Sequence, residues 1–291
     1  TVCESIENKI RNLFNIDNCV EGIGFPTGFS VNNIAAHDSA LPNDKRIIKY
    51  DDVIKVDFGT HRNGNIIDSA FTVAFNPVYE PLLKATYDAT WTGIKLAGPD
   101  VLINDISKEI QEVIESYELT LNNKTYPLKA ITNLGGHTIE PYKIHGGKLV
   151  LCAPSSHKYI KNMRMEAGEC FAIETFATTG TTGYVNEDYD IATSHYMINP
   201  NHINKQFTLN ATKKVYNHVY KNRKTLPFCT RWLHNEGLKG YNMGLKELES
   251  KNVISSYPPL VDKEGTYTSQ FEHTIYIHEY GKEVLSHGDD Y

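Results

Sequence analysis

The sequence has few cysteines and no long hydrophobic run. Its five cysteines form no close pair and no CxxC pattern, and an odd number cannot all pair within one chain. We therefore expect a reducing compartment, specifically the cytoplasm. No stretch approaches the roughly 20 apolar residues needed to span a bilayer, and the N-terminus lacks the apolar core of a signal peptide. The composition thus predicts a soluble protein with no membrane association.

An excess of basic residues is also missing. The formal net charge is -6 at pH 7, which argues against a nucleic-acid binder held by its overall field. A local basic patch at Lys213 to Lys224 stays open as an alternative, although a solvated helix face is the simpler interpretation. We expect no direct binding of nucleic acid.

Linkers and low-complexity segments are absent as well. Strand-like and helix-like segments alternate without a Gly/Ser-rich or Pro-rich break, so we expect a single catalytic domain over residues 1–291. The stretch 204–256 is richer in Lys, Asn and Leu, and we interpret it as a helical insertion within that domain. The sequence begins at Thr1 rather than Met, which leads us to expect that further residues precede it.

Periodic patterns predict an α+β fold. DDVIKVDFGT (51–60) is typical of a strand, Asn63-Gly64 of a hairpin turn, and NIIDSAFTVAF (65–75) of the return strand. One helix is expected over 81–97, and a second carries apolar residues at helical spacing, namely Ile106, Ile110, Val113, Ile114 and Tyr117. ECFAIETFAT (169–178) can be laid over 52–60 with Glu174 on Asp57, which hints at an internal duplication.

The first hairpin carries two acidic residues among apolar ones. If Asn63-Gly64 form the loop, Asp68 pairs with Gly59, and Asp57 then lies diagonally from Asp68 on the same face. Two buried like charges are unfavourable unless a cation neutralises them or one of them is protonated. The alternative is that one aspartate faces solvent or caps a turn.

Three further residues favour a metal site. Glu174 in FAIETF and Glu272 in SQFEHTIYI interrupt apolar strands, where a carboxylate without a partner is unfavourable. Taken singly, each would more often face solvent or lie at an edge. His137 follows two glycines in NLGGHTI, which let the backbone bring its ring close to another group.

Two Asp, one His and two Glu make an oxygen-rich donor set with a single nitrogen. Such a set suits two divalent ions such as Mn, Fe, Co or Zn better than one tetrahedral structural zinc. Ions bridged by carboxylates can hold a hydroxide between them and polarise a carbonyl group, so hydrolysis is the reaction class that the residues predict.

The surroundings of these residues extend the pattern over most of the chain. From about residue 22 to the C-terminus the sequence contains, in order, FPTGFSVNNIAAH, DDVIKVDFGTHRNGNIIDSAF, NLGGHTI, IHGGK, MEAGECFAIETFATTG, SHYM, YPPL, QFEHTI and a closing HGDDY. Together these stretches resemble the methionine aminopeptidases of type 2. The subtype follows from the 98 positions between Glu174 and Glu272, since the corresponding strands of type 1 members lie much closer in sequence.

The resemblance implies the pita-bread fold, with a pseudo-twofold curved antiparallel sheet that carries the metals and with helices packed outside. It implies that Asp57 chelates one ion, that Asp68 and Glu272 bridge both, and that His137 and Glu174 complete the other. The implied activity is removal of an N-terminal methionine from nascent proteins and peptides, with ribosome association a possibility.

The resemblance also implies roles around the metals. Glu174 would shuttle a proton from the attacking hydroxide to the leaving amine, and His145 would help to stabilise the tetrahedral intermediate. His37 would lie near the scissile bond, at the position that covalent epoxide inhibitors modify. The residues that would line the methionine pocket are Phe25, Ile144, His195 and Tyr257. For Phe25 and Ile144, plain core packing is a nearly equal alternative.

Two other classes of function stay open at this point. Proline-specific peptidases and creatinase-like enzymes share the implied fold, but they resemble this chain less around AAH, SHYM and YPPL. A binding protein without catalytic activity would be expected to have lost metal ligands, whereas all five positions are filled here.

Overall fold

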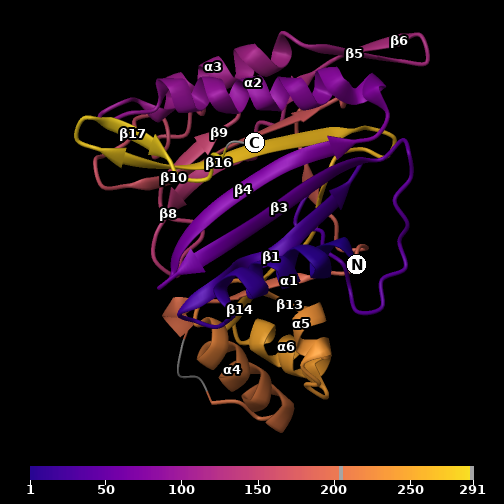
Figure 1. Ribbon diagram of the computed structural model, residues 1–291, viewed down its shortest axis with the longest axis vertical. Helices are drawn as coiled ribbons and strands as arrows, with labels where there is room; N and C mark the ends of the chain where they lie inside the picture. The colour runs from indigo at the N-terminus through magenta and orange to yellow at the C-terminus, as the bar shows by residue number, and fades with distance from the viewer. Residues whose placement is uncertain (203–205, 289–291) are drawn as a thin grey trace.

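The computed structural model describes residues 1–202 and 206–288. The expected start of the insertion at residue 204 and the last three residues of HGDDY lie outside the described residues. A nine-stranded sheet with the strand order β1-β3-β4-β16-β10-β8-β9 crosses the middle of the molecule, with β17 beside β16 and β7 beside β10 (Figure 1). Every pairing in it is antiparallel. Its strands are β1 (Glu21–Val31), β3 (Val53–Arg62), β4 (Asn65–Ala74), β7 (Lys129–Ala130), β8 (Gly135–Ile139), β9 (Leu149–Leu151), β10 (Cys170–Thr178), β16 (Thr268–His278) and β17 (Gly281–Val284).

The β3–β4 hairpin has the predicted register. Its two-residue loop places Asn63 at φ 52° and Gly64 at φ 81°, as a type I′ turn requires at both central positions. Gly59 then pairs with Asp68. The predicted turn and pairing register are therefore confirmed, and the two strands begin and end within two residues of the predicted bounds.

Two helices, α2 (Glu80–Leu96) and α3 (Ile103–Glu115), cover one face of the sheet (Figure 1). A short 3-10 turn, η1 (Pro77–Tyr79), precedes α2. The prediction of both helices is confirmed. Tyr117 is not part of the second helix, because that helix ends at Glu115 and the chain then enters a β5–β6 hairpin (Glu118–Leu121, Lys124–Pro127). The buried isoleucines of α3 and the small residues of α2 pack with β10 and β16 into the main core.

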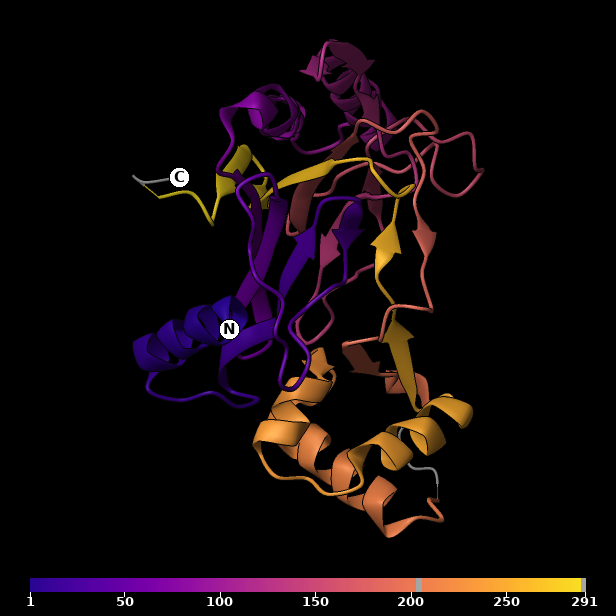
Figure 2. The same ribbon diagram turned by 90° about the vertical axis from the view of Figure 1, so that its right-hand side faces the viewer.

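Smaller elements lie below the sheet and at its edge (Figure 2). One small sheet, in the order β13-β12-β14, adjoins three helices that pack with one another and with the N-terminal helix. Another has the order β11-β15-β2. Their elements are β2 (Ile34–Ala36), β11 (Asn186–Glu187), β12 (His195–Ile198), η2 (Pro200–His202), α4 (Asn210–Arg223), β13 (Phe228–Cys229), α5 (Thr230–Asn235), α6 (Tyr241–Ser250), β14 (Ile254–Tyr257) and β15 (Leu260–Val261).

The N-terminal helix α1 (Val2–Phe14) had no counterpart among the sequence predictions. Thr1 caps it with a full capping box, in which its hydroxyl accepts from the Glu4 amide while the Glu4 carboxylate accepts from Thr1. Its buried face includes Cys3, Glu7 and Ile10. A charged residue therefore lies on the buried face of this helix.

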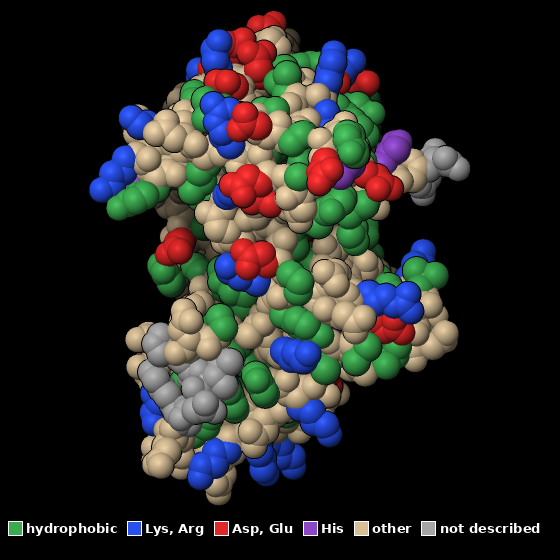
Figure 3. Space-filling model, turned by 90° about the vertical axis from the view of Figure 1, so that its left-hand side faces the viewer, with side chains coloured by type: hydrophobic (Ala, Val, Ile, Leu, Met, Phe, Trp, Pro, Cys, Tyr) green, Lys and Arg blue, Asp and Glu red, His purple; other side chains and the backbone are tan. Residues whose placement is uncertain are grey.

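The exposed charges are unevenly distributed over the surface. Lys and Arg gather at the end of the molecule where α4 to α6 lie, while acidic residues are frequent at the other end (Figure 3). Lys213, Lys214 and Lys221 are exposed, whereas Arg223 is buried against Asp17. Within the described part of the chain, no helix is both long and apolar enough to cross a bilayer, and all five cysteines are free.

Candidate metal centre

One row of residues across the main sheet carries three carboxylates. Asp57 on β3 lies opposite Ala70 on β4, Ala70 lies opposite Glu272 on β16, and Glu272 lies opposite Glu174 on β10. Residues directly opposite each other on antiparallel strands point to the same face. Asp68 is two residues from Ala70 and so points to that face as well. The sheet register alone thus gathers four acidic side chains, with one methyl group between them.

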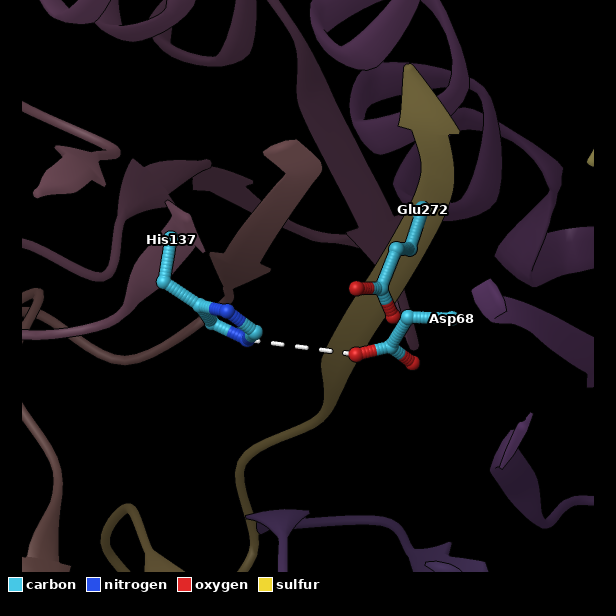
Figure 4. Close-up of side chains that lie close together, drawn as sticks. All are labelled: Asp68, His137 and Glu272. Carbon is cyan, nitrogen blue, oxygen red and sulfur yellow. Dashed lines mark ion pairs between the residues drawn. The ribbon is translucent and has the colours of Figure 1, made fainter. Parts of the chain in front are cut away.

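His137 joins this face from the next strand, β8. It lies opposite Ala172, which is two residues before Glu174. A Cβ at Gly136 would stand 2.0 Å from the Ala172 carbonyl oxygen, so only glycine allows β8 to approach β10 this closely. The imidazole Nδ1 is 3.2 Å from the Thr138 carbonyl oxygen, and Nε2 is 3.9 Å from an Asp68 carboxylate oxygen (Figure 4). Because a carbonyl only accepts hydrogen bonds, Nδ1 carries the hydrogen and Nε2 presents a lone pair toward the carboxylates.

The donor atoms fall into two groups that share one carboxylate. Within each group, one ligand atom per residue lies within 4.8 Å of the others. The groups are Asp68, His137 and Glu272, and Asp57, Glu174 and Glu272. Glu174 thus lies with Asp57 here, whereas the resemblance assigns it to the ion of His137. The amide of Gln270 contacts both members of this pair, since it donates to Asp57 at 3.1 Å and to Glu174 at 2.7 Å.

Crowding and burial disfavour the charged forms of these carboxyls. Burial raises the pKa of Asp57 to about 6, despite the hydrogen bond from Gln270. The pKa values of Asp68, Glu174 and Glu272 lie well above the ordinary range, first because of burial and then because of the neighbouring carboxylates. A divalent cation among them would reverse both effects.

The residues present fit such a cation. The Oδ1 atoms of Asp57 and Asp68 are buried and have no hydrogen-bond partner among the residues that the structure describes. Neither these two carboxylates nor Glu174 forms an ion pair with a Lys or Arg of the described chain. Buried carboxylate oxygens without a basic partner are what a site for divalent ions requires. The spacing of the two groups, with Glu272 in common, fits two neighbouring ions.

A cavity of about 310 Å³ adjoins the carboxylates, and six more of the predicted site residues line it, three of them histidines. The ring of His145 is 4.6 Å from that of His137, and the ring of His37 is 6.2 Å from that of His195 and 5.6 Å from Tyr257. Burial lowers the pKa of His37 to about 3 and that of His195 to about 4, and it lowers the pKa of His145. All of these rings are therefore neutral at physiological pH.

Apart from Asn133, the rest of the cavity wall is largely apolar. Phe25 sits against Gly59, where a Cβ would stand 2.2 Å from its ring. Phe25 and Ile144 line the cavity and also belong to one small buried cluster with Ile66, so pocket lining and core packing both describe them. The further apolar lining residues are Pro26, Ala36, Leu134, Leu149, Leu151, Phe176, Met197 and Pro227. Every predicted site residue lines the cavity except Glu272, which is buried behind it.

Comparison with protein families places the chain in a known family. Residues 2–199 match the model of metallopeptidase family M24. The chain belongs to this family. For an M24 metallopeptidase, the carboxylates and His137 are the residues on this face whose chemistry suits the metal.

Relatives of this M24 chain bear out the resemblance seen in its sequence. Methionine aminopeptidase 2 of Arthroderma benhamiae is 49% identical over 296 residues, which cover 100% of this chain and 65% of that protein. The chain therefore spans about two thirds of the length of this relative. Among solved structures, a thermophilic Arx1 matches with a TM-score of 0.82 at 19% identity, covering 100% of this chain and 83% of that one. Methionine aminopeptidase from Thermotoga maritima matches with a TM-score of 0.61 at 18% identity, covering 98% and 86%. The predicted pita-bread fold is confirmed.

One polar residue of the M24 site was missed by sequence reasoning. Gln270 is buried and donates to two of the candidate ligands, Asp57 and Glu174. A signal for it was present, because Gln270 precedes Glu272 by two residues on a strand and so points to the same face. A polar residue on the same face of the strand as a buried carboxylate can hydrogen-bond to the metal ligands and fix their orientation.

Proposed function

We propose that this M24 metallopeptidase is a methionine aminopeptidase of type 2, which hydrolyses the bond after an N-terminal methionine. The observation that carries the proposal is the junction of two features, a five-residue oxygen-rich cluster and a largely apolar cavity that opens onto it. The 49% identity to methionine aminopeptidase 2 of Arthroderma benhamiae supports the substrate class.

We propose two divalent ions as cofactors, one for each group of ligands. They would be held by Asp57, Asp68, His137, Glu174 and Glu272. When bound, they would supply Lewis-acid activation of a water molecule and of the scissile carbonyl group. Five donors with four carboxylates suit Mn, Fe, Co or Zn, among which the donor set makes no sharp choice.

The protein groups around the ions would guide the proton and the charge. Glu174, held by Gln270 at 2.7 Å, would accept a proton from the attacking water and deliver it to the leaving amine. His145, next to His137, would donate a hydrogen bond to the oxygen on which charge develops. The apolar wall would hold the unbranched thioether side chain, with Phe25, Ile144, His195 and Tyr257 around it.

His37 would lie beside the scissile bond. Its pKa of about 3, set by burial and by the neighbouring His195 and His145, keeps the ring neutral at neutral pH, with one of its two nitrogens unprotonated and nucleophilic. This property supports the proposal that covalent epoxide inhibitors modify His37. The physiological partners would be the N-termini of nascent proteins in the cytoplasm, with ribosome association as a possible context.

The experiment is a metal-dependent release assay. Protein stripped with a chelator would be reloaded with each of the four metals, and free methionine would be measured from a Met-Ala-Ser peptide. We expect release only after loading, at about two ions per chain by elemental analysis. An Xaa-Pro peptide with a large first residue tests the proline-specific alternative. Metal-loaded protein that leaves Met-Ala-Ser intact would refute the proposal, and preferential cleavage of the Xaa-Pro peptide would replace it.

A further inference from the structure

Far from the metal ligands, a buried carboxylate on the N-terminal helix binds several parts of the chain. Glu7 on α1 is fully buried. Its two oxygens accept from both terminal nitrogens of Arg231 at 2.7 Å, from the indole of Trp232 at 2.9 Å and from the backbone amide of Thr27 at 3.3 Å. A paired Arg and carboxylate with this geometry form a directional clamp. None of these contacts belongs to the metal centre.

The first segment that this clamp reaches carries one wall of the cavity. Thr27 on β1 directly follows Pro26, which lines the cavity and whose carbonyl oxygen is 3.4 Å from Nε2 of His195. The Thr27 carbonyl also accepts from the hydroxyl of Ser39 at 2.7 Å. Through Thr27, Glu7 thus fixes the stretch of backbone whose Pro26 carbonyl contacts the His195 ring.

The second segment is the loop that follows His37. Nε of Arg231 donates to the Ala40 carbonyl at 3.0 Å, and another of its nitrogens is 3.5 Å from Oγ of Ser39. His37 has φ 66°, a left-handed conformation that is unfavourable for a residue other than glycine and persists only when its surroundings hold it. The clamp holds the chain within three residues of that strained histidine.

The third segment carries His195 itself. His195 lies opposite Cys229 on β13, two residues before Arg231. The amide of Thr230 donates to the Ser194 carbonyl at 3.2 Å, and the Ser194 hydroxyl is 2.8 Å from Nδ1 of His195. Both ring nitrogens of His195 therefore face groups connected to Glu7. Nε2 faces the Pro26 carbonyl, next to Thr27, and Nδ1 faces Ser194, which is hydrogen-bonded to the residue before Arg231.

We infer that Glu7 is a positioning residue for the methionine pocket, acting through Arg231 and Thr27 on His195 and His37. The inference rests on the proposed function and extends it, because it assigns a role in substrate binding to a helix that no lining residue comes from. The ligand-bearing strands β3, β4, β8, β10 and β16 contribute none of the residues that hydrogen-bond to Glu7. Loss of the clamp is therefore expected to weaken substrate binding and to leave the metals in place.

The test compares Glu7→Gln with a matched variant, Asp17→Asn. Asp17 is also a nearly buried carboxylate near α1 that accepts two hydrogen bonds from an arginine, Arg223. It shares Arg11 with Glu7 and accepts from the Ile23 amide, but its hydrogen bonds lead neither to the loop after His37 nor to the strand of His195. For Glu7→Gln we expect KM for Met-Ala-Ser to rise by about tenfold or more, since misplaced binding groups lose affinity steeply, with metal content and metal affinity unchanged. Asp17→Asn is expected to keep the wild-type KM.

Two further measurements keep the inference testable if Glu7→Gln is poorly folded or if the protein does not cleave the peptide. Ser39→Ala removes one hydroxyl of the network and is expected to raise KM in the same direction by a smaller factor. Histidine-ring NMR needs no turnover, and we expect the signals of His37 and His195 to shift in Glu7→Gln but not in Asp17→Asn, while those of His137 stay.

The outcomes separate the inference from the proposed function. Unshifted His37 and His195 signals, or an equal rise of KM in Asp17→Asn, would overturn the positioning role even in an active aminopeptidase. Shifted signals in a protein that releases no methionine would support the positioning of the rings and refute the proposed function alone.

Discussion

Buried carboxylates occur in two regions of this protein, and they differ in their partners. Glu7 and Asp17, near the N-terminus, each face an arginine at hydrogen-bond distance. Asp57 and Asp68, in the main sheet, have buried oxygens without a hydrogen-bond partner in the described part of the chain. A buried charge needs a counter-charge. The first region contains its own, and the second is built to receive one as a metal ion.

The same contrast is visible in the pKa values. Burial by itself would raise the pKa of Asp17, but hydrogen bonds and charge from Arg223 outweigh it and lower the value below the ordinary range. At Asp68 burial acts together with the charge of Asp57, and the pKa rises. The ionised carboxylate of Asp17 therefore stabilises the first region. Without metal, an ionised carboxylate at Asp68 destabilises the second region.

The largest expected effect comes from removing a carboxylate of the second region. Asp68→Asn keeps the shape of the side chain but takes away a ligand, so we expect kcat for Met-Ala-Ser to fall by at least about 10³-fold, as for other groups that act in the transition state. Because Asp68 is unfavourably buried, the metal-free variant should be no less stable than the wild type. Exposed Glu140→Gln, three residues after His137, is the control. Retained activity would remove Asp68 from the site.

The reverse pattern is expected in the first region. Asp17→Asn leaves Arg223 buried without its counter-charge, so we expect a loss of about 3 kcal/mol in the free energy of unfolding, measured by denaturant titration. The kcat of the metal-loaded enzyme should stay near that of the wild type. A large loss of kcat with unchanged stability would contradict the division into a structural and a metal-binding region.

A smaller effect is expected from the amide that orients the ligands. Gln270→Ala removes hydrogen bonds to Asp57 and Glu174, and we expect metal affinity to fall by about 10- to 100-fold, as when other groups that hydrogen-bond to metal ligands are removed. Calorimetric titration of the chelator-treated protein measures this directly. Gln111→Ala, in an exposed pair on α3, should bind metal normally. An unchanged affinity in Gln270→Ala would show that the strands alone hold the carboxylates.

The two regions also differ in how far the sequence predicted them. Asp57 and Asp68 were placed together because a two-residue turn and strand alternation fix their register within one hairpin. Glu174 and Glu272 stood out as charges in apolar strands. Their pairing opposite each other was beyond local reasoning, because 98 positions separate them, and it was the family resemblance that joined them.

Glu7 and Arg231 gave no such signal. On an amphipathic helix a single glutamate is normally a solvated residue, and an arginine in the Lys-rich and Asn-rich stretch after residue 204 looks equally ordinary. Their partnership spans 224 positions and depends on tertiary packing that no periodicity encodes. Sequence-based prediction therefore fails at residues such as these, whose buried environment in the fold differs from what their local pattern indicates.

The smallest expected effect is a difference in the pH dependence of stability. In the metal-free protein the folded pKa of Asp57 is about 6, above the value of about 3.9 expected for an unfolded chain. The stability that its neutral form contributes is therefore complete below about pH 4 and is lost as pH rises through about 6. The other raised carboxyls extend this loss upward. Asp17 acts in the opposite sense, because its contribution is present above about pH 4 and is lost as pH falls through its lowered folded pKa.

Since bound ions require ionised ligands, the rise in melting temperature on adding Mn²⁺ should grow between pH 5 and 7.5, by about 2–4 °C for each kcal/mol. Differential scanning fluorimetry at constant ionic strength measures this rise, and Asp68→Asn should flatten it. A rise that is independent of pH would mean that the carboxyls are already ionised without metal, and the contrast between the two regions would fail.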